Sequence, residues 1–157
     1  MALAGTGLGY YSTCRLQRHI GELEKWQRLI VFLEGRLRYT AAPVQEMLRA
    51  ASLQVRGLEF LKESLSCPAE DFADVWERSI DRYAALNALT SADSTLWKEM
   101  GNVLGRSDRE SQLSALELYA RRLSDALEEA RCEAREKGKL YLSLGVTGGM
   151  AAALLLL

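Results

Sequence analysis

The sequence predicts an all-α protein, an antiparallel bundle of about six helices with hydrophobic, membrane-associated ends. Apolar residues recur at spacings of three and four along most of the 157-residue chain, as they do on one face of an α-helix. No alternating segment rich in Val, Ile and Thr supports a strand. Residues 1–13 and the run LYLSLGVTGGMAAALLLL at 140–157 contain no Asp, Glu, Lys or Arg.

The first predicted helix covers residues 10–39, where apolar positions from Leu16 to Leu37 form one stripe. The segment RYTAAPVQ interrupts it, and Pro43 is suited to the first position of a new helix. Apolar spacing continues through 43–66, but a glycine inside a helix costs about 1 kcal/mol relative to alanine. We therefore expect two shorter helices here, separated between Ala51 and Gly57.

A fourth helix is expected to open at Pro68, with acidic residues in its first turn, where the helix dipole favours negative charge. A fifth helix follows, with Thr90 or Ser91 as its N-cap. Gly105 is expected to end that helix in the left-handed conformation.

The sixth and longest predicted helix opens with SDRE, which matches a capping box formed by Ser107 and Glu110. Apolar residues then alternate at spacings of three and four, the pattern of a heptad seam. The seam consists of Leu113, Leu116, Ala120, Leu123, Leu127, Ala130 and Ala134.

The uncharged carboxy-terminal run has nearly the length of a membrane span. Eighteen helical residues rise about 27 Å, close to the ~30 Å hydrocarbon thickness of a bilayer. We predict a transmembrane helix at 140–157, with a buried core helix as the alternative. Its membrane-contacting residues include Leu140, Tyr141 at the interface, Gly148 and Leu154.

The amino-terminal segment 1–13 is too short to span a bilayer, so we expect a truncated transmembrane helix, a mis-assigned start or a partly inserted segment. Basic residues flank both uncharged ends on their inner sides, and such residues stay in the cytoplasm. The body of the protein, residues 14–139, is therefore expected to be cytoplasmic. Its first and last helices should run antiparallel and emerge together at the membrane.

The composition argues against several functions. A formal net charge of -1 does not provide the basic surface of a nucleic-acid-binding protein. The sequence has no phosphate-binding loop, no Ser/His/Asp set and no Cys/His cluster. We therefore expect no enzyme activity, no cofactor and no metal site.

An acidic segment, EDFADVWERSID, is the most suggestive surface feature. It is either an ordinary solvated helix face or a docking surface for a basic partner. In the second interpretation, a polar loop before the sixth helix extends the same surface. The candidate partner-binding residues are Glu70, Asp71, Asp74, Glu77, Arg106, Asp108 and Arg109.

Two further residues have predicted structural roles. Glu34 lies next to the apolar stripe of the first helix, so it either sits at the bundle edge or bonds backbone groups of the following turn. We expect the second, with Thr40 and the start of the helix at Pro43 as partners. Trp76 is expected to be a core aromatic residue.

The segments GYYSTCRL, LEGRLRYTAAPVQEML, VWERSI and LGRSDRESQL, followed by an uncharged tail, resemble the stage III sporulation protein AB family of endospore-forming bacteria. The resemblance implies a helical domain similar to the cytoplasmic domains of the inner-membrane platform protein of type II secretion and type IV pilus machines. It implies a location in the mother-cell membrane, within the channel complex that joins mother cell and forespore during engulfment.

The partners implied by the resemblance are a hexameric secretion-type ATPase from the same operon and the other membrane subunits of the channel. The protein itself would hydrolyse nothing and would act as an adaptor, with the acidic segment and the polar loop facing the ATPase. The alternative is a generic membrane-anchored helical scaffold that self-associates through the heptad seam.

Overall fold

The computed structural model describes the backbone of residues 2–40, 42–65, 71–87, 89–106 and 108–155, and the side chains within 14–40, 42–65, 71–87, 89–104 and 108–138. Every regular element in these ranges is a helix, which confirms the predicted all-α class. The six helices are α1 (Ala2–Tyr39), α2 (Val44–Gln54), α3 (Phe60–Ser64), α4 (Phe72–Leu86), α5 (Ser91–Arg106) and α6 (Arg109–Leu155).

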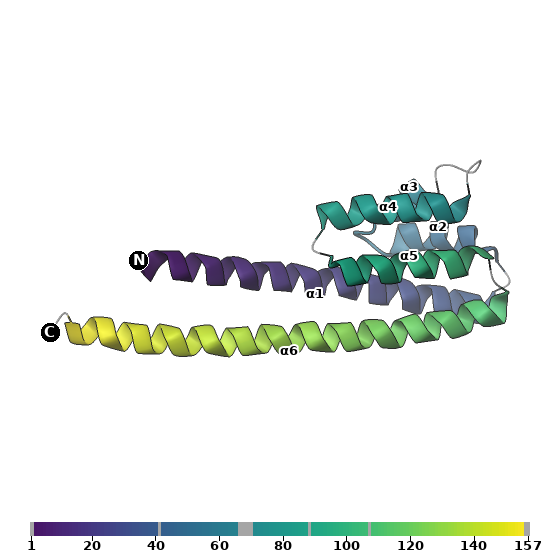
Figure 1. Cartoon of the computed structure of the whole chain (residues 1–157). Helices are drawn as coiled ribbons and strands as arrows, with labels where there is room; N and C mark the ends of the chain where they lie inside the picture. The colour runs from purple at the N-terminus through teal and green to yellow at the C-terminus, as the bar shows by residue number, and fades with distance from the viewer. Residues whose placement is uncertain (1, 41, 66–70, 88, 107, 156–157) are drawn as a thin grey trace.

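The two long helices, α1 and α6, form an antiparallel pair along the whole molecule (Figure 1). Two ion pairs define how they are aligned: Arg131 with Glu24 at 2.8 Å, and Arg38 with Glu117 at 3.4 Å. In both pairs the residue numbers have the same sum, 155, so the two helices keep one register over this length. Both chain termini therefore lie at the same end of the pair (Figure 1).

The four shorter helices pack over one half of this pair, and α1 and α6 extend beyond them (Figure 1). The predicted break in 43–66 is confirmed, because α2 ends at Gln54 and α3 begins at Phe60. Gly57 lies between them with φ of 86°, a conformation that glycine adopts without steric cost. Pro43 is the N-cap of α2 and not its first helical residue, so the helix begins one residue later than predicted.

Two predicted helix boundaries are shifted, and one predicted cap is confirmed. Helix α4 begins at Phe72, after an N-cap at Asp71, and the expected start at Pro68 lies outside the described residues. Gly105 does not end α5, which continues through Arg106. The Thr90 cap of α5 is confirmed: the Thr90 backbone N–H and hydroxyl both donate to Asp93, and the Asp93 N–H donates to the Thr90 hydroxyl.

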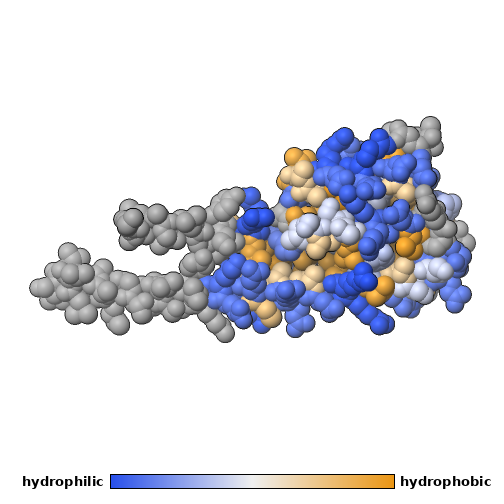
Figure 2. Space-filling view, in the orientation of Figure 1, coloured by the Kyte–Doolittle hydropathy of each residue, from blue (hydrophilic) through white to orange (hydrophobic). Residues whose placement is uncertain are grey.

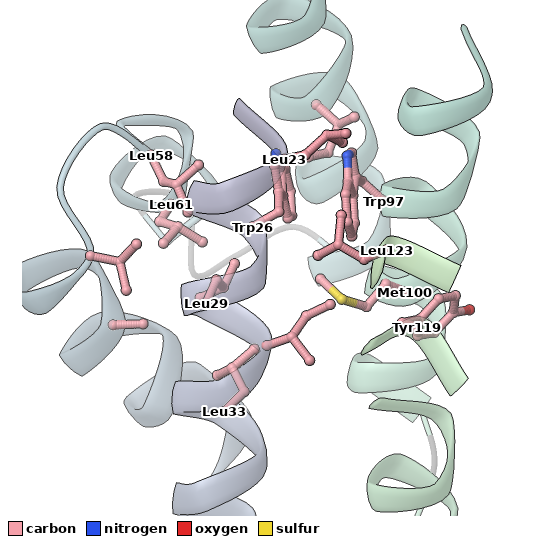
Figure 3. Close-up of a cluster of buried hydrophobic side chains, with 14 of the residues drawn as sticks. Leu23, Trp26, Leu29, Leu33, Leu58, Leu61, Trp97, Met100, Tyr119 and Leu123 are labelled. Atoms are coloured by element: carbon pink, nitrogen blue, oxygen red, sulfur yellow. The ribbon is translucent and has the colours of Figure 1, made fainter. Parts of the chain in front are cut away.

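The core lies where the shorter helices meet α1 and α6 (Figure 3). The rings of Trp26 from α1 and Trp97 from α5 stack with centroids 4.0 Å apart and an interplanar angle of 3°. Phe60 of α3 stacks on Trp26 with centroids 5.0 Å apart, and Trp76 of α4 meets both edge-on. One aromatic cluster thus joins four helices.

The heptad seam of α6 is used inside this core. Leu116, Leu123, Leu127 and Ala130 are buried, and the other seam residues pack partly buried against the same cluster. Helix α6 contacts α1 and α5 along this face. The seam is therefore not a free surface for self-association.

Candidate functional site

The acidic residues of α4 lie on its solvent face and line a shallow depression of about 540 Å³ together with Arg78. Hydrophilic side chains cover this part of the molecule in Figure 2. The predicted residues Asp71, Asp74 and Glu77 are brought together here, and Asp81 extends the row. Glu70 lies outside the described residues.

Part of this acidic face is neutralised by a neighbouring helix. Lys98 of α5 lies 2.7 Å from an Asp81 carboxylate oxygen and 3.3 Å from one of Glu77. The hydrogen bond with Asp81 raises the pKa of Lys98. The negative charge is therefore concentrated toward the amino-terminal half of α4, around Asp74.

Asp71 contributes to the acidic face but also has a structural role. Its carboxylate accepts a hydrogen bond of 3.0 Å from the backbone N–H of Ala73, so Asp71 caps α4. An aspartate is among the best N-caps, because it satisfies an amide that has no partner within the helix. A change at Asp71 would therefore affect folding as well as surface charge.

The polar loop before α6 is organised by Asp108. Its carbonyl oxygen accepts the first hydrogen bond of the helix, from the N–H of Gln112 at 2.9 Å. Its carboxylate accepts from the backbone N–H and the hydroxyl of Ser111, and these bonds lower the pKa of Asp108. The cap is thus Asp108 with Ser111, one residue later than the predicted Ser107–Glu110 pair. Ser107 lies outside the described residues, and Glu110 is exposed.

Arg109 has a role that the sequence did not reveal. Its Nε donates to the carbonyl of Leu37 at 2.7 Å, and one terminal nitrogen donates to the carbonyl of Arg38 at 2.6 Å. These carbonyls lie in the last turn of α1, where the helix leaves them without partners and concentrates negative potential. Two donor groups of the predicted partner-binding residue are therefore engaged within the molecule. The side chain of Arg106 lies outside the described part of the structure.

The first α4 turn and the α5–α6 loop lie at the same end of the bundle, away from both chain termini (Figure 1). The end of α1 lies there too. Thr40 donates from its hydroxyl to the Arg36 carbonyl at 2.6 Å. Polar groups from the two predicted partner-binding segments are thus gathered at the end opposite the uncharged segments.

The prediction that Glu34 bonds the backbone of the following turn is wrong. Its carboxylate accepts from the Arg38 guanidinium one turn later at 3.0 Å, and that guanidinium also reaches Glu117 of α6. Glu34 therefore sits at the bundle edge, the alternative left open by the sequence. Side chains four residues apart face each other on a helix, so this ion pair forms without any loop contact.

Trp76 is fully buried, as predicted, and its indole N–H donates to the Trp97 carbonyl at 2.8 Å. Gly101 makes this contact possible, since a Cβ at that position would lie 2.1 Å from the Trp76 ring. Glycine at 101 thus opens a notch in α5, one turn after the carbonyl that accepts the hydrogen bond.

A buried polar cluster joins α1, α4 and the α2–α3 loop, and sequence reasoning missed it. The Tyr83 hydroxyl bonds the Glu22 carboxylate and lies 2.9 Å from the Gly57 carbonyl oxygen. Lys25 pairs with the same carboxylate at 2.7 Å. Burial raises the pKa of Tyr83, and the Glu22 carboxylate raises it further. The sequence feature that could have predicted this cluster is Glu22, an acidic residue within the apolar stripe of α1.

At the other end of the bundle, the register of α1 and α6 aligns the two changes from charged to uncharged sequence. A sum of 155 places Arg15, the first charged residue of the chain, opposite Leu140, where the uncharged tail begins. If this register continues along the pair, residues 2–14 lie opposite residues 141–153. The boundary between charged and uncharged sequence then falls at one level on both helices.

Among the residues whose side chains are described, no helix contains a stretch long and apolar enough to cross a bilayer. The side chains of Leu140, Tyr141, Gly148 and Leu154 lie outside that set, so their assignment to the membrane stays a prediction. The same described residues hold no group of three or more His, Cys, Asp or Glu side chains placed to bind a metal ion.

Comparisons with known proteins agree with the resemblance seen in the sequence. A solved structure titled "Stage III sporulation protein AB (SpoIIIAB)" is similar, with a TM-score of 0.65 and 18% sequence identity, and the match covers 75% of this chain and 97% of that chain. At this identity the likeness shows the fold alone. No curated protein is significantly similar. The family model for stage III sporulation protein AB matches residues 1–157, and the chain therefore belongs to that family.

Proposed function

We propose that this protein is a non-enzymatic adaptor of the sporulation channel between mother cell and forespore. In this proposal it is anchored in the mother-cell membrane, with its helical body in the cytoplasm, and it couples a hexameric secretion-type ATPase to the other membrane subunits. Membership of the stage III sporulation protein AB family supports the role in sporulation.

The observation that carries the proposal is the separation of two surfaces along one continuous pair of helices. The uncharged ends of α1 and α6 lie at one end of the molecule, and the first turn of α4 with the α5–α6 loop lies at the other (Figure 1). The paired helices α1 and α6 run unbroken between the two ends. Such a body transmits a displacement between a cytoplasmic motor and a membrane complex.

The anchoring is tested by sedimentation of the full-length protein. We expect the protein in the membrane pellet after high-speed centrifugation without detergent, and in the supernatant once detergent is added. Recovery in the detergent-free supernatant would remove the basis for a membrane-anchored adaptor.

The motor-facing surface is tested by reversing charge on α4 while leaving the Asp71 cap intact. The double variant Asp74→Lys, Glu77→Lys should lose co-purification with the ATPase. Its matched control is Asp125→Lys, Glu128→Lys, which changes an exposed acidic pair of the same types and spacing on α6. Helical circular dichroism should be unchanged in both. Equal retention of the ATPase by both variants would show that the α4 face is not the binding surface.

The runner-up function, a scaffold that self-associates through α6, has weaker support. Its proposed interface is the heptad seam, whose central leucines are buried against α1 and α5 within one chain. Self-association by this route would require the bundle to open.

A further inference from the structure

A groove of about 580 Å³ lies at the end of the bundle nearest the uncharged segments. Helix α1 provides one wall, with Arg15, Arg18 and Lys25. The end of α4 and the residue that follows it provide the other, with Leu86 and Asn87. Leu86 is 80% exposed there. Neither the candidate docking face of α4 nor the aromatic core includes this groove.

Two of the three cations of this groove have no acidic partner among the residues that the structure describes. Lys25 is neutralised by Glu22, at 2.7 Å. Arg15 and Arg18 are exposed and form no ion pair with any residue that the structure describes. Deeper along the same pair of helices, Glu24 is matched by Arg131. Unpaired positive charge is therefore left at the outer end of α1.

A second groove, on the other side of Arg15, contains acidic as well as basic side chains. It has a volume of about 480 Å³ and contains Arg15, His19 and Lys137, but also three carboxylates. One of these, Asp93, accepts the bonds that cap α5, and Glu133 pairs with Lys137 at 2.6 Å. The mixed charge of this groove does not favour an anion, whereas the first groove has two arginines without an acidic partner.

The position of the two unpaired arginines indicates the kind of anion. Arg15 and Arg18 lie within the first turn after the uncharged amino-terminal segment, and the register places Arg18 opposite Lys137 of α6. Guanidinium groups bind phosphate oxygens in a bidentate manner, and cations next to a membrane are attracted to anionic lipids. An exposed leucine beside them suits the acyl region below a headgroup.

We propose that this groove, lined by Arg15, Arg18 and Leu86, binds the headgroup of an anionic phospholipid at the cytoplasmic surface of the membrane. The inference rests on the proposed membrane anchoring and adds a lipid class to it. The arginines form charge-assisted hydrogen bonds with the headgroup. This binding holds the adjacent end of the bundle at the bilayer surface.

The test measures the thermal unfolding of the full-length protein in detergent micelles that contain either phosphatidylglycerol or phosphatidylcholine. Phosphatidylglycerol should raise the Tm by about 4 to 8 °C relative to phosphatidylcholine. The variant Arg15→Gln, Arg18→Gln should lose this difference, and its Tm in phosphatidylcholine should match that of the wild type because both side chains are exposed. The control Arg49→Gln, Arg56→Gln, which removes two exposed arginines elsewhere, should keep it.

Equal Tm values in the two lipids, or loss of the difference in the control as well, would overturn the inference. A rise produced by a polyglutamate peptide but not by phosphatidylglycerol would assign the groove to an acidic protein and overturn it too. The anchoring is judged separately by the sedimentation experiment. A protein that enters the membrane pellet yet shows no lipid preference refutes the lipid site and leaves the proposed function standing.

Discussion

At the scale of single residues, Gly101 has the sharpest steric constraint. Its missing side chain admits the Trp76 ring, whose indole N–H bonds the Trp97 carbonyl. The variant Gly101→Ala should lower the free energy of unfolding by about 1 to 3 kcal/mol, because an added methyl group forces the ring to move. Urea denaturation measures this.

The control for this prediction is Gly35→Ala in α1, where a new Cβ meets nothing within 4 Å. Alanine is the better helix former, so this change should raise the free energy of unfolding by about 0.5 to 1 kcal/mol. If both variants were stabilised, Trp76 would have to be free to leave the notch.

The Tyr83 cluster predicts a dependence of stability on alkaline pH. A tyrosine whose pKa is raised in the folded state holds its proton more tightly than in the unfolded state. Its contribution is fully present below the unfolded pKa of about 10 and is lost as pH rises above that value. The free energy of unfolding should therefore fall above pH 10 by about 1.4 kcal/mol per pH unit from this group.

The variant Tyr83→Phe isolates that contribution. At pH 7 it should be less stable by about 1 to 3 kcal/mol, because the buried Glu22 carboxylate loses a donor, and its decline above pH 10 should be shallower than in the wild type. Urea denaturation at a series of pH values checks both. A parallel decline in the two proteins would mean that other groups cause it.

Sequence could identify much of the core at this scale, but not the contacts between particular residues. Periodicity alone predicted that the stripe from Leu16 to Leu37 faces the core, and its residues are buried, as is Trp76. The notch at Gly101 and the bond between Tyr83 and Glu22 depend on which helices are neighbours and at what height. Single-helix patterns carry no such information, because they describe one face at a time.

At the scale of elements, Arg109 links the start of α6 to the end of α1. The variant Arg109→Met keeps the apolar stem but removes the donors to the Leu37 and Arg38 carbonyls. It should lower the free energy of unfolding by about 1.5 kcal/mol in urea denaturation. Arg121→Met, which removes an exposed arginine from the middle of α6, should change it by less than about 0.5 kcal/mol. Equal losses of unfolding free energy would mean that removing a positive charge lowers stability, and that the bonds from Arg109 to the end of α1 contribute nothing.

The sequence predicts which helices are present better than it predicts the residues at which they begin and end. The break between α2 and α3 was expected from Gly57, and Thr90 was among the expected caps of α5. The start of α6 was placed one residue early because Ser107 and Asp108 are adjacent and both residue types cap helices well. Only the geometry of the chain entering the helix decides between two such neighbours.

At the scale of the whole molecule, the register of α1 and α6 links the folded bundle to its uncharged ends. Two ion pairs with the same sum of residue numbers fix that register within the bundle. If it continues to the termini, Cys14 lies opposite position 141, at the edge of the uncharged run. The sequence could show that each end is uncharged, but not that the two boundaries coincide. That coincidence depends on the packing of residues far inside the bundle.

Chemical cross-linking in isolated membranes tests this continuation of the register. Native Cys14 should be joined to a cysteine introduced by Tyr141→Cys when a bismaleimide about 10 Å long is added, because neighbouring helix axes lie 8 to 10 Å apart. The matched variant Gly148→Cys places the thiol about 10 Å further along α6 and should react far less. In both variants Cys67 and Cys132 are replaced by serine. An intramolecular product, seen as a faster-migrating band, is expected only for the first. A stronger product from Gly148→Cys would mean that the register slips by two turns beyond the bundle, and the level boundary between charged and uncharged surface would be lost with it.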